Sequence, residues 1–331
     1  MQIQPTVSYR SAKLSALLTL WQNVTVKFIA LLLLVFCCSA FARLPKVSSG
    51  KIERLYHFSS GYIPPRHVDI WLPEGYNSNS RYAVVYMQDG QMLFDGTDSW
   101  NKQEWRVDEV ASRLIAEGKT KPFIVVAVFN SGVGRHCEYF PEKAFRRLAP
   151  AEQQAMLQLK RQNQQPVFSQ PLSGDNYLKF LVTELKPYID THYSVLTDPA
   201  NTVIVGSSMG ALISLYALSE YPQVFGAAGC LSTHWPGSVA TEQNPIPAAL
   251  FDYLRETLPQ AQQAGHKLYF DHGTETLDAG YAPLQAQADA IVQSKGYTAK
   301  NWQSRVFEGA AHDENTWAER LHLPLQFLLR R

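Results

Sequence analysis

The segment from Thr202 to Ser219 constrains the fold of this 331-residue chain more than any other. Its first nine residues read TVIVGSSMG, so a β-branched run leads into the pattern Gly-x-Ser-x-Gly, and the residues that follow have helical character. A strand, a tight turn and a helix in this order form the setting of a nucleophile elbow, which exposes a serine hydroxyl above a mostly parallel sheet. We therefore expect Ser208, the serine between the two glycines, to be a nucleophile.

The two glycines of this pattern have a steric purpose. Side chains at positions 206 and 210 would collide with the neighbouring strand and helix, because the serine sits in a strained turn. The N-terminus of the following helix also places positive potential beside a developing oxyanion. Met209, the residue after the nucleophile, is expected to donate one backbone N–H to that oxyanion. Ser207 lacks the spacing to both glycines and is not the expected nucleophile.

Short apolar runs alternate with helical stretches along the rest of the chain. The patterns predict strands at 68–72, 82–87, 123–129, 202–205, 227–231, 267–270 and 302–307, and helices at 177–188, 211–219 and 314–329. The first of these strands alternates in polarity, as an antiparallel strand does, whereas 123–129 is apolar throughout and should be buried on both faces. This order predicts an α/β-hydrolase fold, with a mostly parallel sheet flanked by helices, over residues 43–331.

A serine hydroxyl needs a general base, and in this fold the chain order is serine, acid, histidine. His312 follows the last predicted strand and precedes the closing helix, so it is the expected base. His322 falls inside that helix, where a structural role is expected. His234 follows the strand at 227–231 and is a candidate for lining the substrate pocket, together with Trp235 and Arg135.

The acid should follow the strand at 267–270, in the loop DHGTETLD at 271–278. Asp278, beyond the Gly-Thr segment, is preferred, and Glu275 stays open as the alternative acid. Asp271 is still at the strand end and is expected to support the loop. The second oxyanion donor should come from the loop after an earlier strand, MQDGQ at 87–91. The backbone N–H of Gln91 is the candidate there.

Composition and charge exclude several other classes of function. Lysine and arginine number 30 and aspartate and glutamate 29, and without the three basic residues of the first 42 positions the net charge is −2. This balance gives no electrostatic reason to expect a nucleic-acid partner or an anionic membrane surface. The chain has no CxxC pair and no HExxH, so no structural or catalytic zinc site is expected. Cys137 and Cys230 remain in the mature chain, as two independent thiols or as a disulfide.

The first 42 residues resemble an export signal. Lys27 precedes an apolar run from Phe28 to Cys38, and the small residues Ala40 and Ala42 fit an A-x-A cleavage site before Arg43. The run is too short to span a bilayer, so no stable membrane insertion is expected after cleavage. An uncleaved anchor and a lipoprotein are the alternatives. We expect an exported protein, periplasmic or secreted, with a lid-like insertion or a solvated excursion at 150–175.

The residues together resemble the esterase D and enterochelin-esterase group of α/β-hydrolases, from about Arg66 to the C-terminus. The resemblance rests on these segments: YMQDGQMLF (86–94), WRVDE (105–109), Arg135 with Glu138 and Tyr139, YLKFLVTELKPYID (177–190), VIVGSSMGALISLYAL (203–218), YPQVFG (221–226), DHGTETLD (271–278) and GAAHDENTW (309–317). It implies Ser208 as nucleophile, His312 as base, an acid at 275–278, oxyanion donors at Gln91 and Met209, and no cofactor. The usual Gly-Gly after Ser-Met is Gly210-Ala211 here.

The resemblance implies a serine carboxylic-ester hydrolase that works through an acyl-enzyme on a small-molecule ester. Three alternatives stay open. They are a siderophore trilactone esterase, an acyltransferase to a sugar or lipid acceptor, and a non-catalytic binding protein on the same fold. A trilactone site would need cations, for which Arg135, Arg146 and Arg147 are candidates. The sequence does not constrain the oligomeric state.

Overall fold

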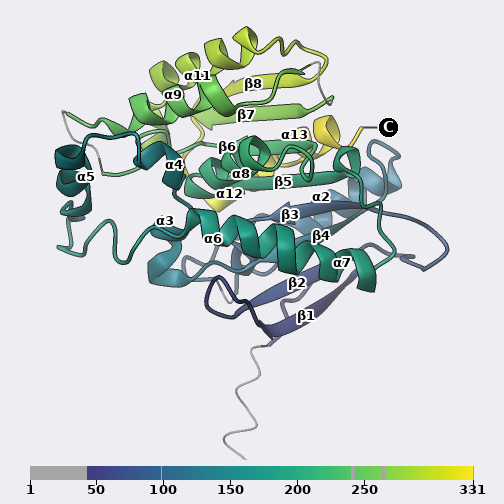
Figure 1. Ribbon diagram of the computed structural model, residues 1–331. Coiled ribbons are helices and arrows are strands. Elements are labelled where there is room, and N and C mark those ends of the chain that lie inside the picture. Colours follow the sequence, from purple (N-terminus) through teal and green to yellow (C-terminus); the bar gives the residue numbers. More distant parts are fainter. Residues whose placement is uncertain (1–42, 98, 240–242, 262–264, 331) are drawn as a thin grey trace, which may run out of the picture. The chain divides into compact units, whose positions relative to one another are not determined.

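The computed structural model describes residues 43–97, 99–239, 243–261 and 265–330, and its sheet and helices belong to the unit Pro45–Arg331 (Figure 1). The predicted export signal, residues 1–42, lies outside the described residues. Eight strands form one sheet in the order β1-β2-β4-β3-β5-β6-β7-β8. Their bounds are β1 Lys51–Phe58, β2 Arg66–Leu72, β3 Ala83–Met87, β4 Phe123–Val128, β5 Thr202–Ser207, β6 Ala227–Leu231, β7 Lys267–Gly273 and β8 Trp302–Phe307.

The sheet is mostly parallel, as the alternating pattern predicted. β1 pairs with β2, and β2 with β4, in the antiparallel sense, whereas all the pairs from β4 to β8 are parallel. β4 is buried along its whole length, because its continuous apolar sequence packs helices on both faces. β1 was not predicted, since its sequence KIERLYHF carries charges along a half-exposed edge strand.

Two apolar cores lie on opposite faces of the sheet, and successive residues of β5 divide between them. Val203 and Val205 face one core and Ile204 faces the other. Figure 1 shows α6, α7 and α8 in front of the strands. The first core contains residues of α2 (Val107–Ala116), α12 (Glu314–Arg320) and α13 (His322–Leu328). The second contains residues of α3 (Arg135–Glu138), α4 (Glu142–Phe145), α5 (Pro150–Leu157), α6 (Gly174–Lys179), α7 (Lys186–His192), α8 (Met209–Glu220), α9 (Ile246–Thr257) and α11 (Ala282–Ser294).

Two predicted helices are interrupted. The closing helix at 314–329 is divided into α12 and α13 at Leu321, three residues before Pro324, whose ring cannot donate a backbone hydrogen bond. The helix at 177–188 contains a π-helical stretch, Phe180–Leu185, between α6 and α7. Pro187, the second residue of α7, accounts for it, because a proline removes one backbone donor and clashes with the preceding turn.

The excursion at 150–175 packs against the loop that follows β4. Its helix α5 ends at Leu157, before a bridge between Lys160 and Pro166. Phe168 then lies edge-on to His136 at 5.0 Å, and Ser169 Oγ donates to the carbonyl of Val133 at 2.8 Å. The second half of the excursion is therefore attached to the domain at Phe168 and Ser169, while residues 161–166 are exposed.

Candidate active site

Ser208 occupies a strained turn between β5 and α8. Its φ of 57° and ψ of −122° are unusual for a residue with a side chain, and strain of this kind persists only where the surroundings impose it. Its N–H donates to the carbonyl of Leu231 on β6 at 3.0 Å, and its carbonyl accepts from the N–H of Leu212 on α8 at 3.2 Å. The turn is thus held from the neighbouring strand and from its own helix.

The flanking glycines are needed because the backbone approaches itself here. A Cβ added at Gly206 would lie 2.4 Å from the carbonyl oxygen of Gly210, which is closer than any real Cβ contact. A Cβ at Gly210 would lie 3.2 Å from a carboxylate oxygen of Asp89, on the loop after β3. The distance at Gly206 excludes any side chain, as the pattern predicted, whereas the distance at Gly210 leaves only a tight fit for one.

The predicted acid and the predicted base are hydrogen-bonded. His312 Nδ1 lies 2.6 Å from Asp278 Oδ1, and the side chains are 8% and 0% exposed. Burial by itself would raise the pKa of Asp278, but the hydrogen bonds and charge of His312, with donors from Ser232 and Gly273, bring that pKa below its usual value. Asp278 is therefore a carboxylate at neutral pH, aimed at the imidazole.

Glu275 has a different environment from Asp278. Its residue is exposed, whereas Asp278 is 1% exposed, and its backbone N–H donates to the carbonyl of Ala310 at 3.0 Å. The structure therefore joins Asp278 to His312 and leaves the Glu275 residue at the surface.

Backbone bonds fasten the acid loop to the base loop. The N–H of His312 donates to Thr276 Oγ1 at 2.9 Å, and the carbonyl of Ala310 accepts from the N–H of Thr274 at 3.1 Å. A Cβ at Gly273 would lie 2.0 Å from that same carbonyl oxygen, so only glycine permits this contact. The two loops follow adjacent parallel strands, β7 and β8, and their close contact fixes the distance between Asp278 and His312.

His234 connects the serine turn with the base. Its N–H donates to the carbonyl of Ser208 at 3.2 Å, and its Nδ1 lies 2.6 Å from the hydroxyl of Tyr281. Since its Nε2 lies 3.1 Å from the carbonyl of Ser238, Nε2 carries the proton and Nδ1 accepts from Tyr281. Burial, helped by the charge of His312, lowers the pKa of His234 to about 4. The Tyr281 ring lies edge-on to His312 at 5.9 Å.

The two candidate oxyanion donors each lie in the first turn of a helix. Met209 is the first residue of α8, and Gln91 is in the single 3-10 turn Gly90–Met92 after β3. The first N–H groups of a helix have no partner within it, so they are free to bind an anion. β3 and β5 are neighbours in the sheet, so these turns follow adjacent strands. Gln91 and Met209 remain the predicted donors.

Arg135 holds the loop that contains Gln91. Its Nε and Nη2 donate to the two carboxylate oxygens of Asp89 at 2.6 and 2.7 Å, and Asn130 Nδ2 adds a bond of 2.7 Å. Asp89 has a φ of 58°, in the left-handed region, directly before the 3-10 turn. The guanidinium was predicted to line the substrate pocket, but two of its donor atoms are used on Asp89.

The prediction for Trp235 needs a correction. Its side chain is 0% exposed, its ring packs at 5.3 Å from Phe251, and its Nε1 donates to Gln285 Oε1 at 2.9 Å. It is part of the apolar core that includes residues of α9 and α11. His234, one residue earlier, is the one beside Ser208.

The sequence reading missed Ser232 and Arg320. Ser232 directly follows β6, and its hydroxyl donates to Asp278 Oδ2 at 2.6 Å, while Arg320 of α12 donates to that hydroxyl at 3.0 Å. The position of Ser232 at the carboxyl end of a parallel strand could have indicated a place near Asp278 and His312, since the carboxyl ends of parallel strands meet at one edge of the sheet. Nothing in the local sequence distinguishes Arg320.

The sequence left open whether Cys137 and Cys230 form a disulfide. Cys137 and Cys230 are both buried free thiols, and burial raises the pKa of Cys230 well above its usual value.

In the part of the chain that the structure describes, no three histidine, cysteine, aspartate or glutamate side chains are grouped so as to hold a metal ion.

Comparison with solved structures supports the fold. A ferulic acid esterase from Anaeromyces mucronatus, in complex with ferulic acid, superposes with a TM-score of 0.56 at 20% identity over 86% of this chain and 93% of that one. The enterobactin esterase of Shigella flexneri gives 0.58 at 16% identity, over 86% of this chain and 60% of that one. The predicted α/β-hydrolase fold is confirmed.

Comparison with curated sequences finds distant relatives. The chain is 25% identical over 289 residues to an endo-1,4-beta-xylanase/feruloyl esterase of Xylanibacter ruminicola, which covers 86% of this chain and 32% of the relative. It is 22% identical over 155 residues to an uncharacterised Bacillus subtilis protein, YbbA, covering 47% of this chain and 60% of that one. The chain thus spans about a third to three fifths of these relatives. The family model "Putative esterase" matches residues 63–328, and the chain therefore belongs to that esterase family.

Proposed function

We propose that this protein is a carboxylic-ester hydrolase that works through an acyl-enzyme on Ser208. The observation that carries the proposal is the 2.6 Å hydrogen bond between His312 Nδ1 and the buried, ionised Asp278. It fixes the imidazole tautomer that carries its proton on Nδ1, which leaves Nε2 free to act as a base. Family membership and the strained Ser208 turn support the same conclusion.

In the proposed mechanism, His312 accepts the Ser208 hydroxyl proton as the oxygen attacks the ester carbonyl. The N–H groups of Gln91 and Met209 stabilise the oxyanion of the tetrahedral intermediate. His312 then gives the proton to the leaving alcohol, and the acyl group stays on Ser208. Water, activated by His312, attacks this acyl-enzyme, so the acid is released and Ser208 is regenerated.

The charges around the site favour a neutral ester over a siderophore trilactone. A trilactone site would need cations for its anionic substrate, but each arginine considered for that purpose has a carboxylate partner. Arg135 binds Asp89, Arg146 binds Glu142, and Arg147 binds Glu256. We therefore place carboxylesterase activity before siderophore hydrolysis, and acyl transfer to a sugar or lipid after both.

We further propose that the domain acts outside the cytoplasm, after removal of residues 1–42. The charged residue, apolar run and Ala-x-Ala pattern at 27–42 support this proposal. Among the described residues, none of the helices has the length and apolar character needed to cross a bilayer.

The proposed activity is tested on the chain from Arg43 onward, with p-nitrophenyl acetate and butyrate and with a fluorophosphonate probe followed by intact mass. We expect turnover of both esters and a single adduct. A folded protein that neither hydrolyses the esters nor reacts with the probe would contradict the proposal and favour the binding-protein alternative.

Substitution of Arg135 by lysine is expected to lower kcat about tenfold. Lysine keeps the charge but cannot make the two parallel bonds to Asp89, so the turn with the Gln91 N–H loses its support. Loss of a whole oxyanion donor costs about 10²–10³ in rate, and displacement should cost less. Steady-state hydrolysis per titrated site measures the effect. Arg147→Lys, at an exposed arginine that binds Glu256 in the same way, is the matched control. Equal rates for the two variants would disprove this role of Arg135.

A further inference from the structure

Both oxygens of the Asp278 carboxylate have hydrogen-bond donors. Oδ1 lies 2.6 Å from His312 Nδ1. Oδ2 accepts from the hydroxyl of Ser232 at 2.6 Å and from the N–H of Gly273 at 2.6 Å. One side of the carboxylate therefore faces the base and the other faces a buried group of side chains, none of which belongs to the proposed catalytic set.

The proton of the Ser232 hydroxyl has one available direction. The oxygen accepts from Trp317 Nε1 at 3.0 Å and from Arg320 Nη2 at 3.0 Å. A serine hydroxyl has two lone pairs and one proton, so the two N–H donors occupy the lone pairs. The proton is therefore directed to Asp278. Trp317 and Arg320 are both on α12, which begins just after His312.

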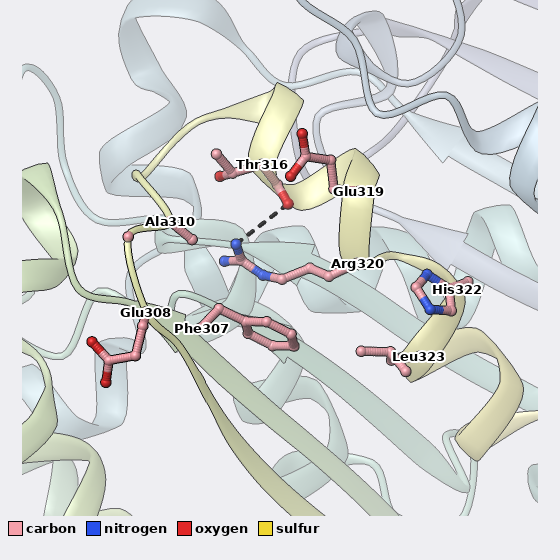
Figure 2. Close-up of a pocket in the computed structure, with 9 residues that line it drawn as sticks. Phe307, Glu308, Ala310, Thr316, Glu319, Arg320, His322 and Leu323 are labelled. Carbon is pink, nitrogen blue, oxygen red and sulfur yellow. Dashed lines mark hydrogen bonds between the residues drawn. The ribbon is translucent and has the colours of Figure 1, made fainter.

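Arg320 is itself fixed on several sides. Its side chain is 4% exposed, its Nε donates to Asp271 Oδ1 at 3.2 Å, and its Nη1 donates to the carbonyl of Thr316 at 3.3 Å. The guanidinium lies 5.0 Å from the centre of the Phe307 ring, and Figure 2 shows it between that ring and Thr316. Burial raises the pKa of Asp271 to about 6, against the opposing charge of Arg320.

A pocket of about 290 Å³ lies beside Arg320. It is lined by residues of β8, the loop after it, α12 and the start of α13, as Figure 2 shows, and neither Ser208 nor His312 is among them. Arg320 thus lines this pocket, and its guanidinium also donates to the hydroxyl of Ser232. We expect a small solute in the pocket to reach the space that opens when the Arg320 side chain is removed.

We propose that Ser232 and Arg320 are positioning residues for the Asp278–His312 pair. Arg320 orients the Ser232 hydroxyl, and the hydroxyl holds Asp278 ionised and rotated so that Oδ1 meets His312 Nδ1. The inference rests on the proposed function, because Asp278 and His312 serve the hydrolysis there. The hydrogen bonds of the Ser232 hydroxyl in the described structure join it to Asp278, Trp317 and Arg320 and not to Ser208, so we expect the influence of the two positioning residues on the reaction to pass through Asp278.

The first test is Ser232→Ala, with kcat and KM measured across pH and divided by the number of sites titrated with the fluorophosphonate. Hydrogen bonds to charged groups are strong enough for kcat to fall roughly tenfold to a hundredfold. KM should stay near the wild-type value, since the hydroxyl does not reach the substrate. The acid limb of kcat/KM should move to higher pH, because a carboxylate with fewer donors stabilises the imidazolium more strongly. Ser219→Ala is the matched control, a buried serine bonded only within α8.

The second test is Arg320→Ala with and without added guanidinium chloride at millimolar concentration. The substitution should lower kcat, because the Ser232 hydroxyl loses a donor. Added guanidinium should restore part of kcat, because the pocket gives it access to the space that the side chain leaves. Urea at the same concentration should not restore kcat. Arg320→Lys keeps the charge without the planar fork and is expected to recover only part of the rate.

A third measurement does not depend on turnover. The proton shared by His312 Nδ1 and Asp278 should give a far-downfield NMR signal in the wild type, and Ser232→Ala should shift or remove it. An unchanged signal, together with wild-type kcat and acid limb in Ser232→Ala, would overturn the positioning role while Ser208-dependent hydrolysis still stood. A wild type that neither labels nor hydrolyses esters would overturn both proposals.

Discussion

Replacement of Ser208 by alanine is expected to lower kcat/KM for p-nitrophenyl esters about 10⁴-fold or more. The variant has no oxygen with which to form the acyl-enzyme. Only substrate binding and the oxyanion donors then remain, and these provide a small part of the rate acceleration. The folded state should be kept, because alanine differs from serine only by the hydroxyl, and the backbone bonds that hold the turn involve no side-chain atom of residue 208. Steady-state hydrolysis of the p-nitrophenyl esters measures the fall in kcat/KM, and intact mass measures the loss of the fluorophosphonate adduct.

The neighbouring serine supplies the control. Ser207 is the last residue of β5, is 2% exposed, and pairs in register with Leu231. Ser207→Ala should therefore retain hydrolysis within a few-fold and keep the adduct. Turnover retained by Ser208→Ala and lost by Ser207→Ala would show that the wrong serine has been assigned.

Replacement of Asp278 by asparagine is expected to lower kcat about 10⁴-fold. An amide presents an N–H donor as readily as an oxygen, so it no longer enforces the imidazole tautomer with its proton on Nδ1, and it cannot stabilise an imidazolium by charge. The Ser232 hydroxyl and the Gly273 N–H, both now donating to Oδ2, would favour the amide oxygen at that position and turn the NH₂ toward His312. Single-turnover acylation measures the effect directly.

Glu275→Gln is the matched control for that variant. It removes a carboxylate from the same loop, but the residue is exposed, so hydrolysis should stay within a factor of about two of the wild type. A large loss of hydrolysis with Glu275→Gln and a small loss with Asp278→Asn would assign the acid role to Glu275. That outcome would also remove the basis for the proposed positioning role of Ser232 and Arg320.

Local sequence was sufficient to predict most of the sheet. The strands at 227–231 and 302–307 were predicted with the bounds that the structure has, because an apolar or alternating run between turn residues has few alternatives. The predicted closing helix is present but interrupted at Leu321, and the prediction for Trp235 was wrong. Pro324 accounts for the interruption, and Trp235 is buried in the core while His234 is only partly buried, a difference that a stretch without periodicity does not reveal.

The serine turn is predictable from local sequence. A β-branched strand, two glycines around a serine and a helix-forming run are all within eighteen residues, so their geometry follows from local sterics. The preference for Asp278 over Glu275 as the proposed acid rests on contacts between distant parts of the chain. Asp278 meets His312 34 residues away and Ser232 46 residues away, and Ser232 meets Arg320 88 residues away. The order β6-β7-β8 makes these loops neighbours. The hydrogen bonds from His312, Ser232 and Gly273 keep the buried Asp278 ionised, whereas the Glu275 residue remains at the surface.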